Sequence, residues 1–133
     1  MEFFKYHNSQ FQIPEEIRVA YINYWRKLAK PGSWWSGAER ISIAEASRGA
    51  LNCLFCKERK KSLTPYGIKG EHDSVEGLSQ IVIDAVHRVV TDQTRITQKL
   101  INENEKIGLS QEAYVELVGI VVAVFSIDEF HRA

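Results

Sequence analysis

The sequence predicts an all-α protein of one domain, and three observations lead to this prediction. Apolar residues recur at helical spacing in several segments, while no stretch shows the alternating pattern of a half-buried strand. Helix start signals divide these segments from one another. The chain has 133 residues, 44% of them hydrophobic, which is enough for a single core. We see no internal repeat, so one domain is expected over 1–133, with 1–13 as an N-terminal arm.

The arm and the first two helices are predicted as follows. The arm carries aromatic residues without a clear period, namely Phe3, Phe4, Tyr6 and Phe11. The first helix begins at Pro14, since proline is accepted in a first turn, and it runs to about Ala29, before Pro31 and Gly32. The second helix runs from Gly37 to about Leu51, after a capping box at 36–39. Its small residues allow another helix to approach closely, so we expect it to be central.

The middle of the chain contains a short helix, a long connection and a second long helix. Asn52 is the expected N-cap of the short helix, which continues through the charged segment 57–61. A polar connection follows over 62–74, and a connection of this length is either a lid or disordered. The fourth helix is expected from about Val75 to Val90, with apolar residues on two faces.

Two further helices complete the six. The fifth is expected from about Gln93 to Lys106 and is ended by Gly108. The last helix begins after Ser110, and its body at 117–127 is apolar on every side. Such a helix must be buried in a monomer core or against a second subunit. We therefore expect a homo-oligomer whose interface includes the last helix.

Charge and apolar content exclude several partners. Seventeen basic residues balance seventeen acidic residues, so there is no electrostatic case for nucleic acid or an anionic membrane surface. The longest uncharged apolar run, 117–127, falls well short of the roughly 20 residues that span a bilayer. The first residues lack the order of a signal peptide, so a cytoplasmic location is expected. In the cytoplasm a C-x-x-C motif is more often catalytic or metal-binding than a structural disulfide.

The motif that carries chemistry is formed by Cys53 and Cys56, the only two cysteines. Two thiols at C-x-x-C spacing on the first turn of a helix can close a disulfide, and a helix N-terminus stabilises a thiolate. This is the geometry of a redox site. Because the preceding segment is helical, the strand, motif and helix order of thioredoxin is absent.

Two segments around this motif resemble a known family. They read GAERISIAEASRGALNCLFC at 37–56 and GLSQEAYVELVG at 108–119. Both are similar to the AhpD-like alkylhydroperoxidase group of the carboxymuconolactone decarboxylase superfamily, and the similarity extends from about Trp35 onward. The resemblance implies a helical homo-oligomer whose dithiol cycles through a disulfide while it reduces peroxides or partner disulfides. It also implies that Cys56 is the thiol that meets the peroxide, with a thiol or protein as reductant and with no cofactor or metal.

The chain departs from that family at Lys60. Peroxidases of the group carry a histidine four residues after the second cysteine and a glutamate on the preceding helix, which together relay protons. A lysine cannot relay protons near neutral pH unless its pKa is strongly lowered. Glu45 is the candidate for the glutamate, because an unpaired carboxylate is costly in an apolar helix. The alternative is a partly exposed Glu45 that pairs with Arg40 or Arg48.

The four histidines differ as relay candidates. His87 lies inside a strongly apolar helix, where it is either part of the relay or a hydrogen-bonded histidine at the edge of the core. His72 lies in the long connection, where it is either part of a lid or simply exposed. Nothing in the sequence recommends His7 or His131. The predicted catalytic residues are therefore Cys53, Cys56, Glu45 and His87.

Two other classes of function stay open. A zinc-binding module needs four ligands, and beyond the cysteine pair these would come from histidine or carboxylate, with no H-x-x-x-H pattern in the chain. A non-catalytic interaction protein could keep the fold without its chemistry, as the missing histidine allows. Decarboxylation is disfavoured, since nothing explains why that reaction would need a dithiol.

Overall fold

The computed structural model describes residues 11–132, and this part of the chain is all-helical, as predicted. Six α-helices and one 3-10 helix follow one another: α1 (Glu15–Leu28), α2 (Gly37–Ala50), α3 (Leu54–Lys61), α4 (Gln80–Thr91), η1 (Gln93–Arg95), α5 (Gln98–Lys106) and α6 (Gln111–Arg132). Phe3, Phe4 and Tyr6 of the expected arm lie outside the described residues. Phe11, which begins the described part, is largely exposed.

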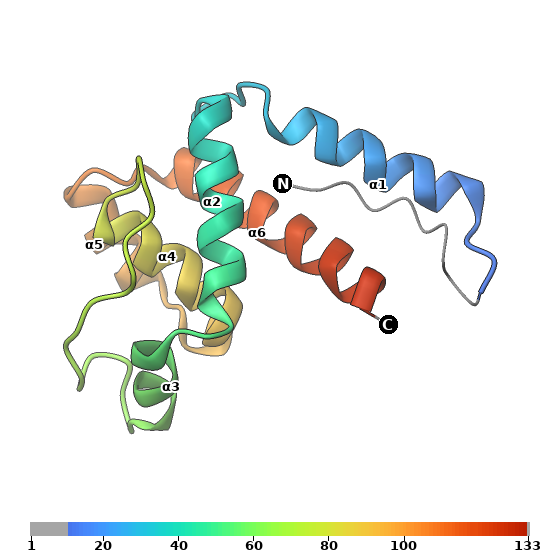
Figure 1. The fold of residues 1–133 in the computed structure, drawn as a ribbon. Helices are drawn as coiled ribbons and strands as arrows, with labels where there is room; N and C mark the ends of the chain where they lie inside the picture. Colours follow the sequence, from blue (N-terminus) through green and yellow to red (C-terminus); the bar gives the residue numbers. More distant parts are fainter. Residues whose placement is uncertain (1–10, 133) are drawn as a thin grey trace.

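The core lies between α2, α4 and α6, which pack on one another, and α3 packs against α4 (Figure 1). Alanine side chains on α2 and α4 let these helices approach closely, and larger apolar side chains fill the space between them. The largest fully buried apolar side chains are Leu28, Ile43, Ile83, Val86, Leu117, Val121 and Val124. As predicted, α2 is central. Figure 1 shows α1 projecting from this core beside the C-terminal half of α6, where Tyr21 meets Phe130 edge to face at 5.2 Å.

The start of α2 is fixed by the predicted capping box and by α6. Ser36 Oγ accepts from the Glu39 backbone N–H at 3.1 Å, and Glu39 Oε1 accepts from the Ser36 N–H at 2.9 Å. Glu116 on α6 accepts from the three consecutive backbone N–H groups of 33–35, at 2.8 to 3.2 Å. These bonds tie the connection between α1 and α2 to the core.

Three predicted helix starts are corrected by the structure. The N-cap of α3 is Cys53 and not Asn52, because the turn after α2 continues one residue further. Helix α4 begins at Gln80 and not near Val75, because Gly77 has a left-handed φ of +84° and Ser79 caps the Val82 N–H. The connection before α4 therefore spans 62–79. The expected fifth helix is divided into η1 and α5, and the latter is capped by Thr97.

Helix α6 is buried on one side only. Its inward face is formed by Leu117, Ile120, Val121, Val124 and Ile127. Val115, Val122 and Phe125 on its outward face are exposed. A groove of about 340 Å³ lies between α4 and α6 and is lined mainly by apolar side chains, among them Val89, Val118 and Phe125. Among the described residues, no helix combines the length and apolar character that crossing a membrane requires.

Candidate functional site

Two cysteines and two histidines meet in a buried cluster at the junction of α3 and α4. Cys53 is the N-cap of α3, Cys56 lies in its first turn, His72 comes from the connection 62–79, and His87 comes from α4. One ligand atom from each of the four side chains lies within 4.8 Å of the others, and all four residues are buried. The two cysteines come within 3.5 Å of each other and are not bonded as a disulfide.

Cys56 is in contact with both imidazoles. Its Sγ lies 3.3 Å from His87 Nδ1 and 3.7 Å from His72 Nδ1. Cys53 Sγ lies 3.4 Å from the same Nδ1 of His72. The two imidazole rings are in edge contact, with centroids 4.3 Å apart. Each sulfur can therefore exchange a proton with a ring nitrogen, without an intervening group.

His72 is held in place although it belongs to an irregular segment. Gln80 accepts from the His72 backbone N–H at 3.2 Å and donates to its carbonyl oxygen at 3.0 Å. Asp84 Oδ1 lies 2.8 Å from His72 Nε2. The ring also meets Phe55 edge to face, with centroids 5.0 Å apart. These contacts leave Nδ1 as the ring nitrogen that faces the sulfurs.

Asp84 connects the cluster to two arginines. Arg59 Nη1 and Arg88 Nε donate to its two carboxylate oxygens, and the Arg59 side chain is almost completely buried. Arg59 Nη2 also lies 4.0 Å from Cys56 Sγ. Burial raises the pKa of Asp84, but hydrogen bonds from His72, Arg88 and Arg59 lower it well below its usual range. The carboxylate therefore stays charged beside His72.

The cluster favours a thiolate on Cys56 and a proton on His72. Burial raises the pKa of Cys56, but hydrogen bonds to His72, His87, Thr91 and Cys53 together lower it to about 5. Burial lowers the pKa of His72, but its bonds to Asp84 and the cysteines raise it to about 10. At neutral pH the pair is thus a thiolate beside an imidazolium, the form that a nucleophilic cysteine requires.

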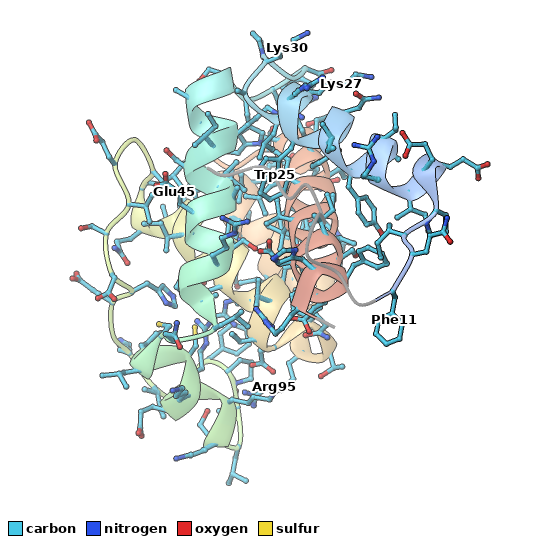
Figure 2. The ribbon with its side chains drawn as sticks, turned by 45° about the vertical axis from the view of Figure 1, so that its right-hand side comes forward. Phe11, Trp25, Lys27, Lys30, Glu45 and Arg95 are labelled. Atoms are coloured by element: carbon cyan, nitrogen blue, oxygen red, sulfur yellow. The ribbon has the colours of Figure 1, made fainter. Side chains whose placement is uncertain are left out.

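Of the four predicted catalytic residues, the structure brings together Cys53, Cys56 and His87 but leaves Glu45 outside the cluster. Glu45 is exposed, on the side of α2 away from Trp25 (Figure 2). The alternative of an exposed Glu45 is therefore nearer the structure, but the expected arginine partners lie elsewhere: Arg48 donates to Asp128 on α6 at 2.7 and 2.9 Å, and Arg40 donates to the Lys30 carbonyl oxygen. Lys60 is exposed as well. Both positions at which the resemblance implies relay residues are therefore exposed and lie outside the cluster.

Sequence reasoning missed Asp84 and Arg59 and left His72 open. One signal was present, because Gln80, Asp84 and His87 are spaced at i, i+4 and i+7 and so share one face of a helix. Arg59 lies three residues after Cys56, which puts both on the same face of α3. Arg59 is buried although the charged residues around it at 57–61 suggest a solvent-exposed helix end. The long connection gave no indication that His72 would fold inward.

Comparison of the chain with protein-family models, with characterised proteins and with solved structures gives no match in any of the three.

Proposed function

We propose that the protein is a thiol-dependent oxidoreductase in which Cys53 and Cys56 reduce a peroxide and are oxidised to a disulfide. The observation that carries the proposal is the contact of Cys56 Sγ with two imidazole nitrogens, with a second thiol within 3.5 Å. Cys56 therefore has imidazole nitrogens beside it for proton transfer, and it has Cys53 as the thiol that can form a disulfide with it. Peroxide reduction by a dithiol is also the chemistry that the resemblance to AhpD-like alkylhydroperoxidases implies.

The reaction has two steps. The Cys56 thiolate attacks one peroxide oxygen, so that an S–O bond forms, the O–O bond breaks, and an alkoxide leaves with a proton from a histidine. The resulting sulfenic acid on Cys56 is attacked by Cys53, so that an S–S bond forms and the hydroxyl group leaves as water after protonation. Two electrons pass from the dithiol to the peroxide. An external thiol or protein dithiol then reduces the disulfide.

His72 and His87 supply the protons in this proposal. Both have Nδ1 within 3.7 Å of the Cys56 sulfur, so either ring lies beside the place where the oxygen of a reacting peroxide would leave. The Asp84 carboxylate stabilises the charged form of His72. The exposed positions of Glu45 and Lys60 give no support to a role for either in this chain.

Burial of the site favours a small substrate. Cys53 is 6% exposed and Cys56 is 2% exposed, so a folded protein disulfide cannot reach either sulfur without movement of the covering connection. A peroxide of few atoms needs much less room. Reduction of peroxides is therefore favoured over reduction of partner disulfides as the first half of the cycle.

Single replacements of the two cysteines test the proposal. Cys56→Ser is expected to abolish peroxide consumption, whereas Cys53→Ser should react once and accumulate a sulfenic acid that a 1,3-diketone reagent traps. Lys60→Met, an exposed change on the same helix, serves as the control. Free thiols are counted before and after one equivalent of peroxide. If Cys56→Ser consumes peroxide as fast as the wild type, the assignment is wrong.

We further propose that the protein is a cytoplasmic homo-oligomer that uses the outward face of α6. Exposed Val115, Val122 and Phe125 and the adjoining groove make an apolar surface that one subunit leaves uncovered. A second copy of the chain offers an apolar surface of the same kind.

A further inference from the structure

We infer that the reduced site binds one Zn²⁺ ion through Cys53, Cys56, His72 and His87. The inference goes beyond the proposed function, because a metal site needs no peroxide chemistry. It also replaces the expectation, taken from the family resemblance, of a site without metal. The observation behind it is the convergence of four ligand side chains, from the start of α3, the connection 62–79 and α4, on one buried point.

The spacing of the ligand atoms fits a tetrahedral ion. Zinc lies about 2.3 Å from thiolate sulfur and about 2.0–2.1 Å from imidazole nitrogen, which puts neighbouring ligand atoms of a tetrahedron roughly 3.3–3.8 Å apart. The three sulfur–nitrogen separations given above are 3.3, 3.4 and 3.7 Å. The widest separation within the four is at most 4.8 Å. A side-chain movement of about 1 Å would therefore complete the tetrahedron.

The surroundings of His72 match those of a metal-bound histidine. A ligating imidazole usually donates its second N–H to a carboxylate, which fixes the tautomer and the ring orientation. Asp84 Oδ1 lies 2.8 Å from His72 Nε2, so Nε2 would keep its proton while the metal displaces the proton on Nδ1, the nitrogen that faces the two sulfurs. Gln80 holds the His72 backbone with two further hydrogen bonds. The irregular segment 62–79 is thus pinned at the one residue that the metal would use.

Charge and ligand type select the metal. Two thiolates neutralise a divalent cation, and the Asp84 carboxylate already has Arg59 and Arg88 as partners. A tetrahedral set of two sulfurs and two nitrogens suits Zn²⁺, whereas Mg²⁺ and Ca²⁺ prefer oxygen ligands. Because all four ligands are buried, no open coordination position faces solvent. Bound zinc would therefore occupy both thiolates and protect them from peroxide.

The first experiment adds Co²⁺ to reduced, metal-free wild-type protein and then displaces it with Zn²⁺. We expect one equivalent to bind, with the strong visible bands of tetrahedral Co²⁺ and sulfur-to-cobalt charge transfer in the near ultraviolet. One equivalent of Zn²⁺ should bleach both signals. Failure to bind stoichiometrically, or the weak spectrum of an octahedral ion, would overturn the inference without any variant.

Variants then assign the ligands. Cys53→Ser and His72→Asn are each expected to weaken Zn²⁺ affinity by about 100-fold or more, and Asp84→Asn by about 10- to 100-fold, as for partners of metal ligands. His131→Asn, an exposed histidine far along the chain, should leave the affinity unchanged. Circular dichroism checks that each variant is folded. Unchanged affinity in folded Cys53→Ser and His72→Asn proteins would show that the ion binds elsewhere.

The outcome is separable from that of the proposed function. Peroxide-dependent loss of thiols is measured on the metal-free wild type, and metal binding is measured without peroxide. Tight zinc binding with unreactive metal-free thiols would contradict the oxidoreductase and leave the metal site standing. Reactive thiols without metal binding would support the oxidoreductase and contradict the metal site. If both are present, one equivalent of Zn²⁺ should slow thiol oxidation by at least about 10-fold.

Discussion

At the scale of single residues, the state of Cys56 is set by its neighbours rather than by its position in the motif. Burial by itself would disfavour a thiolate, since charge is costly away from water. The two histidines reverse this effect, and buried Arg59 adds a positive charge 4.0 Å from the sulfur. The helix N-terminus that both cysteines share does not by itself distinguish one sulfur from the other.

The titration of Cys56 gives the first prediction. With its pKa lowered to about 5, the sulfur is a thiolate above that pH and is protonated as the pH falls through it. In chelator-treated protein, the ultraviolet absorbance of one thiolate should therefore stay constant between about pH 6 and 8 and disappear near pH 5. An ordinary cysteine would instead titrate near pH 8.5. A single transition close to that higher value would contradict the assignment.

The proton relay gives the second prediction. His87→Asn and His72→Asn should each slow peroxide consumption by about 100-fold, as expected for loss of a positioned acid. Glu45→Gln should retain a rate close to that of the wild type, because Glu45 is exposed and outside the cluster. Rates are measured on metal-free, reduced proteins. A large loss in Glu45→Gln with normal rates in both histidine variants would favour Glu45 over the histidines as the proton donor.

At the scale of elements, α4 organises the site with one face. Successive turns carry Gln80, Asp84 and His87, which hold the His72 backbone, the His72 ring and the Cys56 sulfur respectively. Because these residues share one rigid helix, their relative positions are fixed by helix geometry. The opposite face of the same helix supplies core residues such as Val82 and Ala85. The packing of α4 on the core therefore also places its three site residues beside the cysteines.

Asp84 gives the third prediction, at this scale. Asp84→Asn removes the charge that pairs with Arg59, and an unpaired buried arginine is costly. We expect the free energy of unfolding to fall by about 2–4 kcal/mol. This is somewhat less than for a fully buried ion pair, because Asp84 is partly exposed. Urea denaturation of the metal-free protein measures the change.

The matched control for this change is Asp73→Asn, an exposed aspartate in the neighbouring connection. It should alter the free energy of unfolding by no more than about 0.5 kcal/mol. Equal effects of the two substitutions would mean that Asp84 does not stabilise the α3–α4 junction.

At the scale of the whole molecule, the described part of the chain leaves apolar surface uncovered. Helix α6 buries one face in the core, while Val122 and Phe125 on the other face border the groove against α4. Helix α1 projects from the core and buries only Trp25 and Leu28 (Figure 1). A surface of this kind is typical of a subunit that associates with another copy.

Association gives the fourth prediction. The wild type should have a mass in solution of at least twice 15.2 kDa by light scattering. Phe125→Glu should shift the protein toward monomer, because a charge buried without a partner opposes association. Leu63→Glu, which changes an exposed side chain outside the groove, is the control. A wild-type mass near 15.2 kDa at micromolar concentration would exclude the oligomer.

The sequence by itself determined the helices and the cysteine pair. Helical periodicity and the capping signals of Ser36 are local properties, so the all-α class and the start of α2 followed from nearby residues. The start of α4 was misplaced because the φ of Gly77, which breaks the helix, depends on the surrounding connection.

Only the tertiary structure decided which side chains surround the thiols. The sequence favoured Glu45 over His72 as a relay residue, yet His72 is buried against both sulfurs and Glu45 is exposed. The buried position of His72 depends on Asp84 and Gln80, which lie on another element, and no local pattern contains that contact. A site whose members come from α3, α4 and an irregular connection is fixed by packing, because packing sets the distances between segments far apart in the chain.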